Sequence, residues 1–342
     1  MKSGGYNKLK RSRKRRTMRR IGVVSLFLVV IGVSVLLGWQ VVRGIKAITT
    51  GEQPISAPPH TTQTTTITTT TTHPTIAVNA TLSSPRVAVY DVTHSALMYS
   101  QNADMKCYPA SLTKLLTAII ATEECTSDEE FVVGSEISLV QKGSSLAYLE
   151  PGFRMTRDMI IDAMLLPSGN DAAYSIAAHI GRKLSGNTEI SDLEALFAFT
   201  DKMNQKAHQL GAVNSQFSNP DGFYSPDHYT TAADMLEIAK AAIEYENLKQ
   251  TMAKTSASHI LLSGEKMTFK NSNAILNPSS SFYFEGATGM KTGFTNEAGH
   301  CVIVSAKRNG VEVIAVVMGG SSSDGRWQDA VNLLSEAFAA HN

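Results

Sequence analysis

Three short motifs in this chain carry side chains that could act together on a substrate. Ser111 and Lys114 lie three residues apart in "SLTK", so one helical turn would bring the hydroxyl next to the amine. Ser168 and Asn170 in "SGN" offer a hydroxyl and an amide, and "KTG" at residues 291–293 offers an ammonium beside a glycine. Each motif also has an ordinary explanation, since Ser, Gly and Asn are common in turns and lysines protect strand edges.

Taken together, these motifs predict nucleophilic catalysis by a serine. A serine hydroxyl attacks poorly until a base removes its proton, and Lys114 can be that base only when it is neutral. Burial, the positive end of a helix dipole and the second cation Lys291 would each favour the neutral amine. Gly293 has no side chain, so a ligand backbone could approach closely while Lys291 attracts a carboxylate.

Helices are expected to position the first two motifs. The apolar spacing predicts a helix over residues 111–124. A second helix is expected over 156–166, with Thr156 as its N-cap and Pro167 as its stop, which leaves Ser168 to Asn170 in a loop. Further helices are expected from Asp171 as N-cap, around 192–210, and from Thr231, where Thr-x-x-Asp resembles a capping box. This middle block is expected to lack strands.

Strands are expected at both ends of the same region. Residues 86–92 alternate as a strand does, with a hairpin continuing to 105, and residues 299–308 and 311–320 are apolar runs joined by Asn309-Gly310. An amphipathic helix follows over 324–341. The pattern predicts an α+β fold in which both ends of the domain form one antiparallel sheet around a helical middle region, with "KTG" on a strand before the last hairpin.

The first 85 residues predict attachment to a membrane. Residues 1–20 carry ten Lys or Arg and no acid. Residues 21–42 carry no charged side chain, and this run is long enough to cross a bilayer as one helix. Basic residues stay cytoplasmic, so the remainder would lie outside the cell. No Ala-x-Ala site follows, which favours a retained anchor over a cleaved signal peptide. Residues 43–85 are Thr-rich and predict a disordered linker.

The composition of residues 86–342 excludes some functions. This part has 19 Lys or Arg against 29 Asp or Glu, so nucleic acid is not expected as a partner. The three cysteines, Cys107, Cys125 and Cys301, lack metal-site spacing and are expected to be buried free thiols rather than a disulfide pair. No metal and no cofactor is expected, because the nine histidines are scattered.

The order of the motifs and the sequence around them carry a family resemblance. The stretches "GFRMTRDMIIDAMLLPSGNDAAYSIA", "FSNPDGFYSPDHYTTAADM" and "GATGMKTGFTNEAGHCVIVSAKRNGVEVIAVVMG" resemble D-alanyl-D-alanine carboxypeptidases, the low-molecular-weight penicillin-binding proteins. The resemblance covers nearly all of residues 86–342. It implies a β-lactamase/transpeptidase-like fold, a peptidoglycan stem peptide ending in D-Ala-D-Ala as substrate, and inhibition by β-lactam antibiotics.

The resemblance also implies a role for each motif residue. Ser111 would be the nucleophile, its backbone N–H and that of Phe294 would form the oxyanion hole, and Asn170 would hold the peptide amide. Lys291 and Thr292 of "KTG" would bind the terminal carboxylate. Lys114 and Ser168 would share the proton transfers, and which of them acts as the base for acylation stays open.

Related functions remain possible on the same motifs. A D,D-transpeptidase or endopeptidase shares the acylation step, and a non-catalytic wall-binding protein would need no Ser-x-x-Lys. A class A β-lactamase would need a further glutamate, in Glu-x-x-Leu-Asn, and no such stretch occurs between Asn170 and Lys291. The expected location is a single-pass cell-membrane protein with a cytoplasmic N-terminus and an extracytoplasmic catalytic domain.

Overall fold

The computed structural model describes residues 75–77 and 81–341, which lie in one compact unit. The predicted membrane anchor at 21–42 and most of the predicted linker at 43–85 fall outside these residues. Among the residues that are described, none of the helices is both long enough and apolar enough to span a bilayer.

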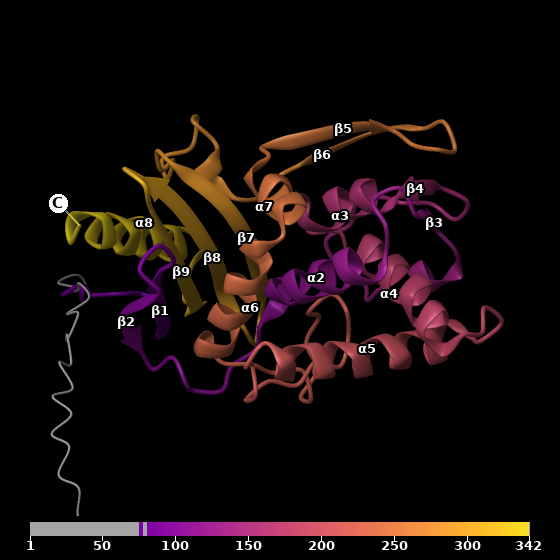
Figure 1. Cartoon of the computed structure of the whole chain (residues 1–342), viewed down its shortest axis with the longest axis horizontal. Coiled ribbons are helices and arrows are strands. Elements are labelled where there is room, and N and C mark those ends of the chain that lie inside the picture. Colours follow the sequence, from indigo (N-terminus) through magenta and orange to yellow (C-terminus); the bar gives the residue numbers. More distant parts are fainter. Residues whose placement is uncertain (1–74, 78–80, 342) are drawn as a thin grey trace, which may run out of the picture. The chain divides into compact units, whose positions relative to one another are not determined.

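A five-stranded antiparallel sheet joins the two ends of the described chain, as the sequence predicts (Figure 1). Its order is β2-β1-β9-β8-β7. The strands are β1 (Arg86–Asp91), β2 (Ala96–Gln101), β7 (Ala287–Thr295), β8 (Gly299–Arg308) and β9 (Val311–Gly320). Asn309 and Gly310 have φ angles of 49° and 84°, which is the conformation that a two-residue hairpin turn requires. The α+β architecture is therefore confirmed.

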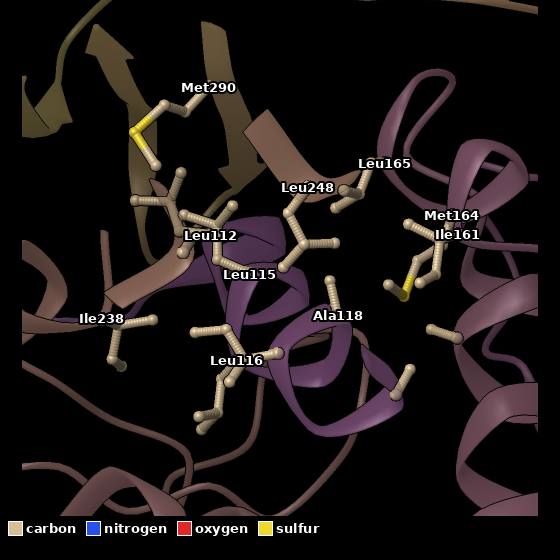
Figure 2. Packing of buried hydrophobic residues seen from close by; sticks show 14 of the residues in the cluster. Leu112, Leu115, Leu116, Ala118, Ile161, Met164, Leu165, Ile238, Leu248 and Met290 are labelled. Atoms are coloured by element: carbon tan, nitrogen blue, oxygen red, sulfur yellow. The ribbon is translucent and has the colours of Figure 1, made fainter. Parts of the chain in front are cut away.

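Helices cover both faces of this sheet and create two apolar cores. The C-terminal helix α8 (Ser323–Ala339) packs on one face through Trp327, Leu333 and Leu334. On the other face lies the helical region, which is built around α2 (Lys114–Glu124). Figure 2 shows Leu112, Leu115 and Leu116 near α2 among residues of the surrounding helices. Since burying a leucine stabilises a fold by about 1.5–3 kcal/mol, this packing fixes the turn that carries Ser111.

The expected helices of the middle region are present. They are α3 (Arg157–Leu165), α4 (Asn170–Ser185), α5 (Asp192–Gln209) and α6 (Ala232–Glu244); a further helix that was not predicted, α7 (Glu246–Ala253), follows α6. The hydroxyls of Thr156 and Thr231 accept hydrogen bonds from Met159 N and Asp234 N, which confirms both predicted N-caps. These caps satisfy backbone N–H groups that would otherwise lack partners.

Three details of the middle region differ from the prediction. It contains two small antiparallel pairs, β3 (Glu130–Val132) with β4 (Arg154–Thr156), and β5 (Ser256–Ile260) with β6 (Lys266–Lys270). These strands are short or largely exposed, so they lack a strong apolar alternation. Ser111 lies in a 3₁₀ turn, η1 (Ala110–Thr113), that leads into α2. The N-cap of α4 is Gly169 rather than Asp171.

Asp171 has a different structural role from the one expected. Its carboxylate accepts hydrogen bonds from the backbone N–H groups of Ala147 and Leu149, each at 2.9 Å. Asn170 N also donates to Ser145 O at 2.8 Å. The start of α4 therefore holds the loop of residues 143–149 in place, and this loop forms one wall of the pocket described below.

Part of the segment before β1 packs against the domain. The amide of Ile76 donates to Met98 O at 3.1 Å, and Ile76 is buried. The Asp329 carboxylate on α8 accepts from Ser83 N, Ser83 Oγ and Ser84 N at 2.8–3.1 Å. These residues were expected to belong to the linker, and the exact domain boundary stays a prediction.

Candidate active site

The pair predicted from "SLTK" is formed at the start of α2. Lys114 Nζ donates to Ser111 Oγ at 2.9 Å, to Asn170 Oδ1 at 2.7 Å and to the backbone oxygen of Asp221 at 2.8 Å. Lys114 is fully buried. Burial lowers the pKa of its amine from 10.5 to about 8, against the opposing effect of the Asp221 and Asp171 carboxylates. The amine is therefore partly neutral near neutral pH and lies within reach of the serine proton.

Asp221 is a central member of this network that the sequence analysis missed. Asn170 Nδ2 donates to its carboxylate, and Phe223 N donates to Oδ1 at 3.0 Å. Burial raises the pKa of Asp221, while the charge of Lys114 opposes that shift. Asn170 thus contacts both Lys114 and Asp221. The second proton of its amide remains for a peptide, so the substrate role expected for Asn170 stays a prediction.

A buried histidine supports the turn that presents Ser111. Ser218 N donates to His228 Nδ1 at 3.0 Å, so the ring proton lies on Nε2, which is 2.8 Å from Thr113 Oγ1. Thr113 Oγ1 in turn donates to Ala110 O at 2.9 Å. Burial, together with the charge of Lys114, lowers the pKa of His228 to about 3. The ring stays neutral and holds the turn by hydrogen bonds.

Two residues at the predicted site have left-handed backbones. Ala110, which precedes Ser111, has φ 48°, and Ser168 has φ 65°. Conformations of this kind cost about 1–3 kcal/mol in residues other than glycine and concentrate at functional sites. Packing keeps the Ala110 turn in place: Gly222 has φ 86°, and a side chain there would overlap the Ala110 carbonyl oxygen.

Strand β7 lies close enough to this turn to complete an oxyanion hole. A Cβ atom added to Gly293 would be 3.2 Å from both Ser111 N and the Ala110 Cβ. A side chain at position 293 would therefore crowd the Ser111 turn, and glycine lets β7 pass close to it. This contact places the Gly293 backbone next to that of Ser111, and the oxyanion hole formed by the N–H groups of Ser111 and Phe294 stays a prediction.

A pocket of about 450 Å³ opens beside Ser111. Six of the predicted site residues line it: Ser111, Ser168, Asn170, Thr292, Gly293 and Phe294. Lys114 and Lys291 are buried outside this lining. Thr292 Oγ1 also lies 2.8 Å from Ser272 Oγ, which is a second hydroxyl of the pocket wall. The three motifs from distant parts of the chain therefore meet around one cavity.

Lys291 and Arg326 form a cationic region along β7. Lys291 Nζ donates to Thr292 O at 3.0 Å, and burial, followed by the charges of Lys114 and Arg326, lowers its pKa well below 10.5. Arg326 comes from α8, lines the pocket, and donates through Nη1 to Gly293 O and Cys301 O at 3.1 and 3.2 Å. Sequence reasoning missed Arg326, because no motif surrounds it.

The lining of this pocket does not have the composition of a metal site. Among the described residues, its walls include the carboxylate of Glu297 but no histidine and no cysteine. Zinc and related metals prefer clusters of these donors. The three cysteines are free and buried, as predicted.

Comparisons with known proteins agree with this geometry. The family model described as D-alanyl-D-alanine carboxypeptidase matches residues 68–322. D-alanyl-D-alanine carboxypeptidase DacF of Bacillus subtilis is 31% identical over 249 residues, and the match covers 72% of this chain. It spans only 59% of the Bacillus protein. A D-alanyl-D-alanine carboxypeptidase of Streptomyces sp. strain K15 is 30% identical, with 71% of this chain and 82% of the relative covered.

A solved structure shows the same fold. The Streptomyces K15 DD-transpeptidase superposes with a TM-score of 0.70 at 27% identity, and the match covers 77% of this chain and all of that structure. The DD-peptidase likeness is thus visible in sequence, fold and motif placement. The chain belongs to the D-alanyl-D-alanine carboxypeptidase family, peptidase S11.

Proposed function

We propose that the protein is a serine-type D-alanyl-D-alanine carboxypeptidase that removes the last residue of the peptidoglycan pentapeptide. The observation that carries this proposal is the 2.9 Å hydrogen bond between Ser111 Oγ and a buried Lys114 whose pKa is about 8. A lysine with an ordinary pKa would be charged at neutral pH and unable to accept the serine proton.

Acylation follows from this arrangement. Neutral Lys114 takes the proton of Ser111, and Oγ attacks the carbonyl between the two D-alanines. The developing negative charge on the carbonyl oxygen is stabilised by the N–H groups of Ser111 and Phe294, each worth about 3–4 kcal/mol when preorganised. The C–N bond then breaks, the leaving amine takes a proton, and the product is an acyl-enzyme on Ser111.

Proton delivery and substrate alignment use the remaining motif residues. Ser168 lines the pocket and passes the proton from Lys114 to the leaving D-alanine amine. The carboxylate of that D-alanine binds at Thr292, where Lys291 and Arg326 supply positive charge. Water then attacks the acyl-enzyme, with Lys114 again as the base, and releases the shortened peptide.

The direct test measures D-alanine release and penicillin labelling for the full-length protein in detergent. Ser111→Ala is expected to lose both activities while keeping its thermal stability, since the hydroxyl faces the pocket. Ser335→Ala removes an exposed hydroxyl on α8 and serves as the matched control. Wild-type protein that neither releases D-alanine nor binds penicillin at Ser111 would contradict the proposal.

A transpeptidase is the second candidate, because the solved structure that superposes at TM-score 0.70 is named a DD-transpeptidase. Both reactions share the acyl-enzyme and differ in whether water or an amine accepts the acyl group. Mass spectrometry of products from a pentapeptide, with and without an added amine acceptor, separates them. A dominant amide product would replace hydrolysis as the main activity.

We further propose that residues 21–42 anchor the protein in the cell membrane, with residues 1–20 in the cytoplasm and the catalytic domain outside. Support comes from the uncharged 22-residue run, from its basic flank, and from a substrate that is assembled outside the membrane. A reporter fused at Met1 should read as cytoplasmic, and one fused after residue 341 as extracytoplasmic. The opposite pattern would contradict the topology.

A further inference from the structure

A second pocket continues from the catalytic pocket around the β7–β8 turn. Its volume is about 530 Å³, and its walls include Arg86 from β1, His300 from β8 and Gly319 from β9. Phe294, Asn296 and Glu297 line both pockets. A substrate bound at Ser111 could therefore extend past Phe294 into this second space without leaving the protein surface.

Arg86 brings an uncompensated positive charge to the second pocket. In the part of the chain that the structure describes, its guanidinium forms neither an ion pair nor a hydrogen bond, and its Nε atom is buried. Gly319 keeps space open beside it, since a Cβ atom there would be 3.1 Å from Arg86 Nη1. A buried guanidinium nitrogen without a partner is costly, so this site favours an anionic ligand.

His300 adds a second unpartnered nitrogen to the same pocket. Its ring stacks on Phe294, with centroids 4.4 Å apart and an interplanar angle of 28°. Within the described residues its Nδ1 atom is buried and has no hydrogen-bond partner. Burial and the charge of Arg326 lower the pKa of His300, so the ring is neutral and carries one N–H in a pocket that Arg86 also lines.

The second pocket lies on the side where the substrate residues upstream of the scissile bond are expected. Thr292 is expected to hold the terminal carboxylate, and Phe294 N–H the scissile carbonyl. Asn296 and Glu297 follow in the opposite direction along the chain. The residues upstream of the scissile bond therefore extend from Phe294 toward Arg86 and His300.

We propose that Arg86 and His300 bind a carboxylate carried by the substrate peptide upstream of its D-Ala-D-Ala end. This inference rests on the proposed carboxypeptidase function. A planar guanidinium matches a carboxylate through two parallel hydrogen bonds. The exposed Glu297 carboxylate lines the same pocket and would repel a ligand of higher negative charge, such as a phosphate, more strongly than it repels a carboxylate.

The experiment compares pairs of pentapeptides that end in D-Ala-D-Ala and differ in one group. In each pair, the second or third residue carries either a free carboxylate or the corresponding carboxamide. D-alanine release by the full-length enzyme gives kcat/KM for both, and their ratio is the measure. At least one pair should favour the carboxylate by roughly tenfold or more, as expected for one hydrogen bond between charged groups.

Variants of Arg86 then test which residue is responsible. Arg86→Gln should bring the ratio close to one. Arg86→Lys keeps the charge but loses the two parallel N–H donors of the guanidinium, and it should give an intermediate ratio. Arg308→Gln is the matched control and should keep the wild-type ratio, because Arg308 contacts Phe284 and Glu285 O away from both pockets. The ratio cancels any general loss of activity, and Arg86→Lys alone suffices if the Gln variant does not fold.

The outcomes separate this inference from the proposed function. A ratio near one in the wild type for every pair, or a wild-type ratio in the Arg86 variants, would overturn the carboxylate subsite while D-alanine release continued. Failure of all peptides to release D-alanine, with no penicillin bound to Ser111, would instead overturn the carboxypeptidase proposal and the inference that rests on it.

Discussion

Lys114 and Lys291 are both buried next to the same pocket, but their surroundings differ. Lys114 has three hydrogen-bond acceptors and the nearby carboxylates of Asp221 and Asp171, and its pKa is about 8. Lys291 donates only to Thr292 O among the described residues and has two cations nearby, which together with burial place its pKa well below 10.5. Lys114 has fixed partners, whereas Lys291 has no negatively charged partner among the described residues and could gain one from a substrate carboxylate.

This difference is consistent with the proposed roles of Lys114 as the base and Lys291 as a binding group. A base must be able to carry the proton for part of the cycle, which requires partners for the ammonium form as well as a lowered pKa. A cation that is uncompensated in the free enzyme gains most from an incoming anion. The following four experiments, in decreasing order of expected effect, test this distinction.

The largest effect is expected for Lys114→Met. Removing the base should slow acylation of Ser111 by about 10²–10⁴-fold, the usual contribution of general base catalysis. It should also lower stability, because Asp221 loses the cation beside its buried carboxylate. Stopped-flow labelling with a fluorescent penicillin and thermal unfolding measure the two effects. Near-normal acylation would mean that another group acts as the base, and the Ser168 hydroxyl would be the next candidate.

Lys291→Met should weaken substrate binding more than it slows acylation. We expect KM for the pentapeptide to rise roughly tenfold or more, the value of one charge-assisted hydrogen bond, with a smaller change in kcat. Stability should rise rather than fall, because a buried cation near Lys114 and Arg326 is removed. Steady-state kinetics measure the change in KM, and thermal unfolding measures the change in stability. A large fall in kcat with an unchanged KM would contradict the binding role.

Asp221→Asn should shift the pH dependence of the reaction. The Asp221 carboxylate raises the pKa of Lys114 toward the ordinary lysine value, so its removal should lower that pKa below about 8. The acidic limb of the kcat/KM profile should therefore move to lower pH. Asn keeps the shape of the side chain and can still accept from Asn170. An unmoved limb would show that Asp221 acts only through its backbone oxygen.

The smallest effect on activity is expected from His228→Gln, which should act mainly on the pH dependence of stability. The folded pKa of about 3 lies below the unfolded value of about 6.5, so the unfolded chain binds one more proton between these limits. The contribution of His228 to the free energy of unfolding is fully present above about pH 6.5. It falls by up to about 1.4 kcal/mol per pH unit as the pH decreases toward about 3. Urea unfolding at several pH values should show a shallower decline for the variant. An identical slope would exclude His228 as the source.

Local sequence signals identified much of this arrangement. The Ser111–Lys114 pair follows from helical spacing, and Pro167 ends α3 just before Ser168. Asn309-Gly310 predicts the β8–β9 hairpin, and "KTG" lies on β7, the strand that pairs with β8. These signals depend on residues close together in the sequence, and therefore the sheet, the caps at Thr156 and Thr231 and the lining motif residues could be anticipated.

Contacts between distant segments could not be anticipated in this way. Asp221 reaches Lys114 across 107 positions, and its "NPDG" context reads as an ordinary turn. Arg326 enters the pocket from α8 without a motif, and Asp171 proved to anchor the 143–149 loop instead of capping a helix. The 3₁₀ turn at Ser111 likewise depends on packing against Gly222 and β7, which the sequence does not reveal.

The hydrogen bonds from Ser83 and Ser84 to Asp329 have a mechanical consequence. A pull transmitted along the preceding chain reaches Ile76, which is bonded to β2, and then these bonds to α8, before it reaches β1. Asp329 and Arg326 are three residues apart on α8, on neighbouring positions of its surface. One of the elements that such a pull would load, α8, thus also carries Arg326, whose side chain lines the pocket.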